Sequence, residues 1–116
     1  MLSRHEIVLT RGARNDIATA SRWSNANFGT NLTAEYRASF AKLILRAAFD
    51  PYCISSFAVS EKAIELRVLH MRAVFSKGRH LVLYRIHDQR LIILRVLHEK
   101  MDLVHHIEKA KRQVKR

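Results

Sequence analysis

The sequence predicts an α+β domain in which helices cover one face of a largely antiparallel sheet. Three observations lead to this fold class. One short strand pattern precedes two helical patterns, extended patterns dominate the second half of the chain, and helical spacing returns near the end. The expected order of elements is β-α-α-β-β-β-α. We expect the sheet face away from the helical hairpin to be shallow and open.

The first strand is expected over Glu6–Thr10, a run that is rich in β-branched residues and leucine. Gly12 interrupts this run, and a helical pattern extends from Ala13 to about Ala26. Gly29 follows, and glycine readily takes the left-handed conformation that ends helices. The sequence therefore predicts a first helix that stops just before Gly29.

A second helix follows at once and ends before Pro51, because proline disfavours helical geometry in the residue before it. Its apolar residues recur at helical spacing and form one stripe: Leu32, Tyr36, Phe40, Leu43, Ile44 and Ala47. Two helices with so short a link form an antiparallel hairpin.

Extended patterns follow a segment, Tyr52–Glu65, that we interpret as mostly loop. A strand is expected over Leu66–Phe75, and then a turn in which Gly78 takes a positive φ. The strands His80–Ile86 and Arg90–Leu97 are joined by a turn so short that they must pair antiparallel.

The last segment returns to helical spacing at Leu103, Ile107, Ala110 and Val114 and ends in a basic run. We therefore expect a domain over residues 1–102 and a basic helical extension over residues 103–116.

Charge is the outlying property of the composition. Across 116 residues, 21 Lys and Arg stand against 10 Asp and Glu, which gives a net charge of +11. Such a small basic domain is expected to seek an acidic partner, namely nucleic acid, an anionic surface or an acidic protein. The single cysteine, Cys53, excludes an internal disulfide and a thiolate metal site. No apolar run is long enough for a signal peptide core or a membrane span, so we expect a cytoplasmic protein without cofactor or metal.

The residues that suggest chemistry are His98, Arg95 and Arg85, which interrupt apolar strands. In a nuclease, a histidine acts as general acid or base and an arginine stabilises the charge on phosphate. A lone histidine without a second placed base is weak evidence, so recognition is the preferred interpretation. His105 and His106 point about 100° apart on a helix and cannot converge on one metal ion.

Two segments carry a resemblance to a known family. The run GRHLVLYRI at residues 78–86 and the run IILRVLHEKMD at residues 92–102 resemble the C-terminal half of ParE-type toxins. These toxins belong to the RelE/ParE superfamily of bacterial toxin–antitoxin modules. The helical hairpin, with Trp23 before a Phe-Gly break and Tyr36 early in the second helix, is also similar.

The resemblance implies the toxin of a type II module, which inhibits DNA gyrase without being an enzyme. A small acidic antitoxin of the ParD kind would neutralise it in a hetero-oligomer. Arginine forks pair well with carboxylates, and an open helical hairpin can hold an apolar helix. The expected antitoxin-binding residues are therefore Trp23, Tyr36, Arg67, Arg72, Arg85 and Arg95. The expected target-binding residues are Lys109, Lys111, Arg112, Lys115 and Arg116.

Two alternatives remain at this stage. The first is a RelE-like, ribosome-dependent mRNA endonuclease that uses His98 with Arg95 or Arg85. Leu81 stands where several mRNA-cutting relatives place an arginine, and no tyrosine follows His98, so the match to these enzymes is incomplete. The second is a basic nucleic-acid binder without further activity.

Overall fold

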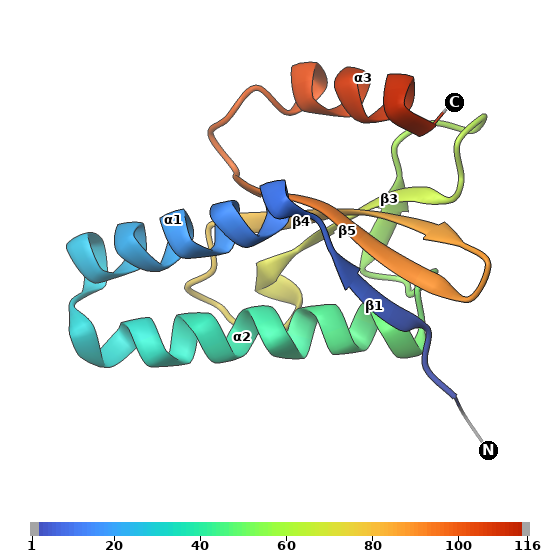
Figure 1. Cartoon of the computed structure of the whole chain (residues 1–116). Coiled ribbons are helices and arrows are strands. Elements are labelled where there is room, and N and C mark those ends of the chain that lie inside the picture. The colour runs from blue at the N-terminus through green and yellow to red at the C-terminus, as the bar shows by residue number, and fades with distance from the viewer. Residues whose placement is uncertain (1–2, 115–116) are drawn as a thin grey trace.

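The computed structural model describes residues 3–114, with side chains up to Arg112. Its sheet has five strands in the spatial order β1-β5-β4-β3-β2, and its three α-helices lie on both sides of that sheet (Figure 1). The elements in chain order are β1 (Glu6–Leu9), α1 (Arg11–Phe28), α2 (Thr30–Phe49), β2 (Ser56–Ala58), β3 (Leu66–His70), the 3₁₀ turn η1 (Met71–Ala73), β4 (His80–His87), β5 (Arg90–His98) and α3 (Leu103–Val114).

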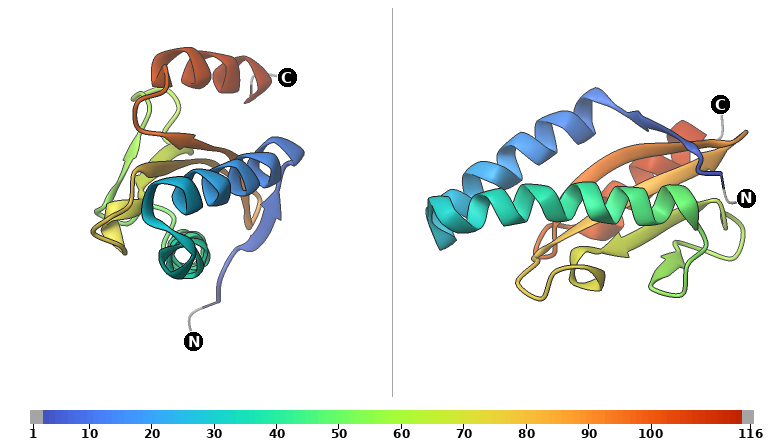
Figure 2. Two further views of the ribbon diagram at one scale, coloured as in Figure 1. Left: turned by 90° about the vertical axis from the view of Figure 1, so that its left-hand side faces the viewer. Right: turned by 90° about the horizontal axis from the view of Figure 1, so that it is seen from below.

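The predicted fold class is confirmed: the α1–α2 hairpin covers one face of a mostly antiparallel sheet. Figure 2 shows the two helices running side by side along the sheet. Their apolar residues form the main core with the strands, and the fully buried members include Tyr36, Leu43, Leu69, Tyr84 and Ile93. β1 pairs with β5 in parallel, so the first and last strands are neighbours.

The opposite sheet face is not open, and this expectation was wrong. α3 packs across it and forms a second core with the strands (Figure 1). Ala110 is buried, and Leu103 and Ile107 are partly buried against this face. The strand residues beneath them are Leu66, Val68, Leu81, Leu83 and Leu97. A sheet rich in leucine and valine on both faces needs cover on both.

The middle of the chain contains a strand that the sequence did not predict. β2 has only three residues, and its pattern is too short for periodicity to reveal. It pairs antiparallel with β3 at the edge of the sheet. The strand expected over residues 66–75 is also shorter, because the chain leaves the sheet after His70 and forms η1.

α1 begins two residues earlier than expected because Thr10 caps it. The Thr10 hydroxyl accepts a hydrogen bond from the Ala13 amide at 3.0 Å. Gly12 therefore lies inside the first turn, where an added Cβ would lie 3.3 Å from Cδ of Arg95. Gly29 links the two helices with φ of 85°, as the sequence predicted.

Gly78 was expected at positive φ, and it does not have it. The residues with positive φ in the β4–β5 turn are Asp88 and Gln89. Gly78 is required for space instead, because a Cβ there would lie 2.7 Å from both Cβ and Cγ of Met71.

Gly78→Ala is therefore expected to destabilise the fold by about 1–3 kcal/mol, because the β4 entry must move away from buried Met71. Urea denaturation followed by circular dichroism measures this change. Ser76→Ala, at an exposed position in the same turn, is the matched control and should change stability by less than about 0.5 kcal/mol. Equal midpoints for the two variants would contradict the packing argument.

No helix within residues 3–114 combines the length and the apolar character that crossing a membrane requires.

Candidate functional site

Arg67 binds its own chain at the edge of the sheet. Its guanidinium donates to the hydroxyl of Ser56 at 2.9 Å and to the Ser56 carbonyl at 3.2 Å. It also lies 5.2 Å from the ring centroid of Tyr52. These contacts hold β2 and the preceding turn against β3. Arg67 therefore has a structural role in addition to any role in recognition.

Arg72 forms part of an ionic cluster around Glu99. The Glu99 carboxylate accepts hydrogen bonds from His70 at 2.9 Å and from Arg72 at 3.0 Å. Arg79 is a weaker partner at 3.9 Å. The hydrogen bond from His70, followed by the nearby arginines, holds the pKa of Glu99 below its ordinary value. The Arg72 side chain is 53% exposed, so it can still reach a partner.

Arg95 is bound twice by Asp16 of α1. Its Nε donates to one carboxylate oxygen at 2.7 Å and its Nη2 donates to the other at 2.9 Å. Asp16 also accepts from the backbone amide of Val96 at 2.9 Å, so one carboxylate fixes α1 to the edge of β5. These bonds hold the pKa of Arg95 above its ordinary value. The sequence analysis did not include Asp16, since no spacing rule connects positions that far apart.

Arg85 differs from the other three arginines. Its Nε is buried without a hydrogen-bond partner among the described residues, and its Nη2 lies 3.4 Å from Nδ1 of His87. Cross-strand pairs share one face of a sheet, and Arg85 pairs with Leu66 on the α3 side. Arg67 pairs with Tyr84, which packs on the α1–α2 side. The four candidate arginines therefore do not converge on one surface.

The two aromatic candidates pack in the core near Gly29, where α1 ends and α2 begins. Tyr36 is 0% exposed, and its hydroxyl accepts from the amide of Arg79 and binds Nδ1 of His80 at 2.7 Å. Tyr36 thus offers no surface to an antitoxin, and this expectation is corrected. Trp23 is half-buried and makes edge contacts with the rings of His80 and His98 at 5.2 and 5.0 Å between centroids.

His98 and His80 meet in a small cavity beside Trp23. The cavity has a volume of about 320 Å³ and is also lined by Asp16 and Lys100. The ring centroids of the two histidines are 5.0 Å apart. His98 Nδ1 accepts from the amide of Lys100 at 3.1 Å, so its neutral form carries the proton on Nε2. The sequence analysis singled out His98 but missed His80, its cross-strand partner at the start of β4.

Both histidines are held in the neutral form. Burial, and next the neighbouring His98, lower the pKa of His80 to about 4. Burial also lowers the pKa of His98. The single acceptor nitrogen of neutral His98 already binds the Lys100 amide, so His98 can take a proton there only after that hydrogen bond breaks. The described residues contain no group of three or more histidine, cysteine or carboxylate side chains that could hold a metal ion.

The basic C-terminal candidates lie on α3. Lys109 and Arg112 are exposed, and Lys111 is partly buried with its amine 3.3 Å from Glu108. Lys115 and Arg116 lie outside the described residues.

One group of exposed apolar side chains was not predicted from the sequence. Within the segment from the end of α2 to β2, several large apolar side chains are exposed: Leu45, Phe49, Tyr52, Ile54 and Phe57. Phe57 belongs to β2 at the edge of the sheet and pairs with Val68, so it lies on the α3 side, whereas Leu45 and Phe49 lie on α2 at the other face. An apolar segment beside a free strand edge is typical of a protein interface. Tyr52, Ile54 and Phe57 belong to the segment that we had interpreted as mostly loop, whereas Leu45 and Phe49 belong to the predicted second helix.

Comparison with known proteins places this fold in a class. A ParDE toxin–antitoxin system of P. aeruginosa matches with a TM-score of 0.64 and 14% identity, over 82% of this chain and 96% of that one. The RelBE2 toxin–antitoxin complex of Mycobacterium tuberculosis matches with a TM-score of 0.56 and 18% identity, over 84% and 94%. At such identities the likeness concerns the fold, which is that of RelE/ParE-like toxins.

The sequence itself gives the family. The family model for the ParE toxin of the type II toxin–antitoxin system, parDE, matches residues 7–103, so the chain belongs to this family. No curated protein matches the chain. The matched region runs from β1 to the first residue of α3, which leaves nearly all of α3 outside it.

Proposed function

We propose that this protein is the toxin of a type II module that inhibits DNA gyrase and is neutralised by an acidic, ParD-like antitoxin. The observation that carries the proposal is the ParE family match across residues 7–103. The state of the arginines supports a non-enzymatic toxin. Arg95, the arginine beside His98 in sequence, already binds both oxygens of Asp16 and is not free to stabilise a phosphate.

The antitoxin surface that we propose is the exposed apolar face of α2 at Leu45 and Phe49, together with its basic border. Lys42 and Arg46 are exposed on α2 beside Leu45 and Phe49. An amphipathic acidic segment matches such a surface, with apolar side chains at the centre and carboxylates at the rim. Arg72 remains a candidate for its carboxylates because its side chain is exposed, whereas the Nε of Arg85 is buried on the α3 side.

The remaining assignments follow from the same proposal. Residues 1–102 form the toxin domain, and the basic extension 103–116 engages the target. The complex with the antitoxin is a hetero-oligomer in the cytoplasm, and no cofactor takes part.

A second candidate function is a ribosome-dependent mRNA endonuclease. The specific observation that favours it is the shared cavity of His80, His98 and Lys100. In this case His98 is the general base once its Nδ1 releases the Lys100 amide, and Lys100 supplies a cation in the same cavity.

Supercoiling by gyrase and the integrity of ribosome-bound mRNA are measured with the purified toxin. We expect blocked supercoiling and intact message. His98→Ala should leave gyrase inhibition within about twofold of the wild type, because a recognition surface does not need an acid or base there. A type I topoisomerase acting on the same DNA should be unaffected, which separates gyrase inhibition from simple coating of DNA.

The opposite pattern supports the endonuclease. Cleaved message with normal supercoiling, lost in His98→Ala and kept in His87→Ala, would overturn gyrase inhibition as the function. His87 is the matched control because it is an exposed histidine in the β4–β5 hairpin.

A further inference from the structure

α3 forms a cationic cavity where it passes the start of α1 and the edge of β5. The cavity has a volume of about 280 Å³. Its lining includes Thr10, Gly12, Leu94, Arg95, His106 and Lys109. Arg95 Nη1 lies 3.3 Å from Nδ1 of His106. Arginine only donates, so His106 accepts and is neutral here.

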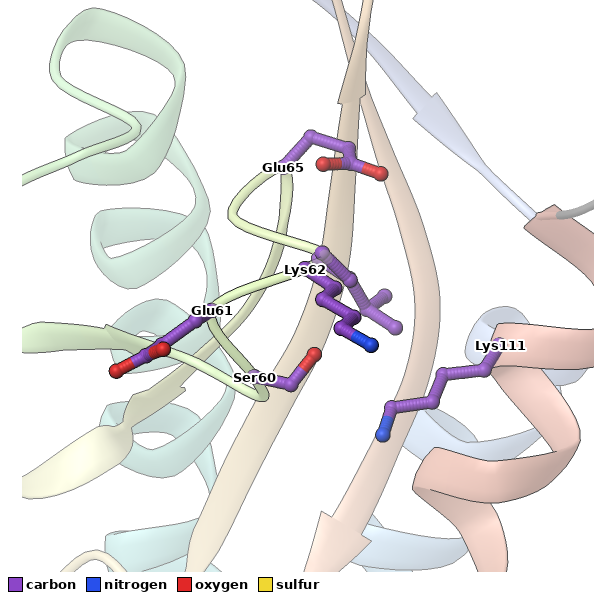
Figure 3. A pocket seen from close by; sticks show the side chains of 7 residues that line it. Ser60, Glu61, Lys62, Glu65 and Lys111 are labelled. Carbon is purple, nitrogen blue, oxygen red and sulfur yellow. The ribbon is translucent and has the colours of Figure 1, made fainter.

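A second cavity lies on the other flank of α3, between that helix and the loop after β2. It has a volume of about 480 Å³, and Ala63 and Leu66 contribute apolar lining. Figure 3 shows the amines of Lys62 and Lys111 directed toward the same space, whereas the carboxylate of Glu61 turns away from it. The lining also includes Glu65, so the second cavity carries two lysines and two glutamates, whereas the first carries Lys109 and no carboxylate.

The segment that contains α3 is strongly basic. Residues 103–116 contain five lysines and arginines and one acid, Glu108. The nearby Asp16 is already shared between Arg95 and the amide of Val96. The first turn of α1, which borders the first cavity, carries Arg11 and Arg14 and no acidic residue. Cations so close together repel one another unless a polyanion lies over them.

The composition of α3 favours one kind of polyanion. Residues 103–116 contain no phenylalanine, tyrosine or tryptophan, and single-strand binders stack bases on such rings. Val104 is the exposed large apolar side chain on the described part of α3, and a single aliphatic group is a poor anchor for a protein partner. Evenly spread cations with two recesses suit the phosphates of a double helix, which are bound through charge and without base contacts.

We propose that α3 and its two flanking cavities form a binding surface for the phosphate backbone of duplex DNA. Lys109 on one flank, Lys62 and Lys111 on the other, and Arg112 on the outer side supply the cations. This binding is independent of sequence. It does not depend on gyrase inhibition and is measured without gyrase or antitoxin.

Fluorescence anisotropy of a labelled random-sequence duplex, titrated with the full chain, tests the proposal between about 50 and 200 mM salt. The triple variant Lys109→Ala, Lys111→Ala, Arg112→Ala should bind about tenfold more weakly at low salt. The slope of log affinity against log salt should fall by about 1 for each phosphate contact that is lost.

The matched control is Arg22→Ala, Arg37→Ala, Lys77→Ala, which removes the same charge from exposed positions on α1, on α2 and in the turn before β4. It should bind within about threefold of the wild type and keep the salt slope. Circular dichroism establishes that both triple variants are folded. Three results would overturn the proposal: an equal loss in both variants, tighter binding to single-stranded RNA than to the duplex, or no binding to the duplex at low salt.

Discussion

Asp16→Ala is expected to lower the free energy of unfolding by about 3 kcal/mol. The substitution removes the two charge-assisted hydrogen bonds to Arg95 and the acceptor for the Val96 amide. The pair is only 15% and 30% exposed, so water replaces these bonds incompletely. β1 pairs with β5 only as far as Ile93. The part of β5 after Ile93 loses its side-chain bonds to α1, so α1 and this part of β5 are expected to separate first.

Guanidinium denaturation with the two-state test measures this loss. Glu6→Ala is the matched control, because it also removes one carboxylate from a basic protein. Its partner Arg90 is 3.7 Å away and both side chains are more than half exposed, so it should cost less than about 1 kcal/mol. Asp16→Asn should fall between the two, since an amide oxygen can still accept from Val96. Similar losses for Asp16→Ala and Glu6→Ala would show that the pair is not structural.

Acidification from pH 6.5 to pH 4 is expected to remove about 3 kcal/mol of stability through His80 alone. Burial lowers the pKa of His80 to about 4 in the folded chain, whereas the unfolded chain binds its proton near 6.5. Below pH 6.5 the unfolded state therefore holds the extra proton, and stability falls by about 1.4 kcal/mol per pH unit until pH 4. Above pH 6.5 His80 adds no pH dependence.

His80→Gln isolates this effect, because a glutamine oxygen can still accept from the Tyr36 hydroxyl but does not titrate. Unfolding free energies measured at several pH values should give wild-type and variant curves that converge as the pH falls. His98, whose pKa burial also lowers, remains in both chains and cancels in the difference. Parallel curves between pH 6.5 and pH 4 would mean that His80 is protonated in the folded state.

The sequence was sufficient for the helical hairpin and for the β4–β5 hairpin, because both rest on local signals. Gly29 ends α1 because it adopts a positive φ. The turn at Asp88 and Gln89 is so short that β4 and β5 can pair only antiparallel. β2 and the place of α3 depend on distant residues. Arg67 holds β2 in place through Ser56. α3 packs on a sheet face rich in leucine and valine, and the periodicity of the sequence does not show which helix covers that face.

The candidate site was predicted less well, and for the same reason. Arginines within apolar strands were interpreted as free for an antitoxin, yet Arg67, Arg72 and Arg95 each bind a group elsewhere in the chain. Whether an arginine is free depends on which acids the fold brings near it. Asp16 and Glu99 had no sequence signal that linked them to Arg95 and Arg72.

The parallel pairing of β1 with β5 has a consequence for synthesis of the toxin. The hydroxyl of Thr10 binds the carbonyl of Leu94 across 84 positions of the chain, and β1 has β5 as its one strand neighbour. Such a non-local contact is slow to form and cannot form before β5 has left the ribosome. A ribosome must therefore translate most of the message before the sheet can close, and a chain that stops short of β5 leaves β1 and the start of α1 without a partner.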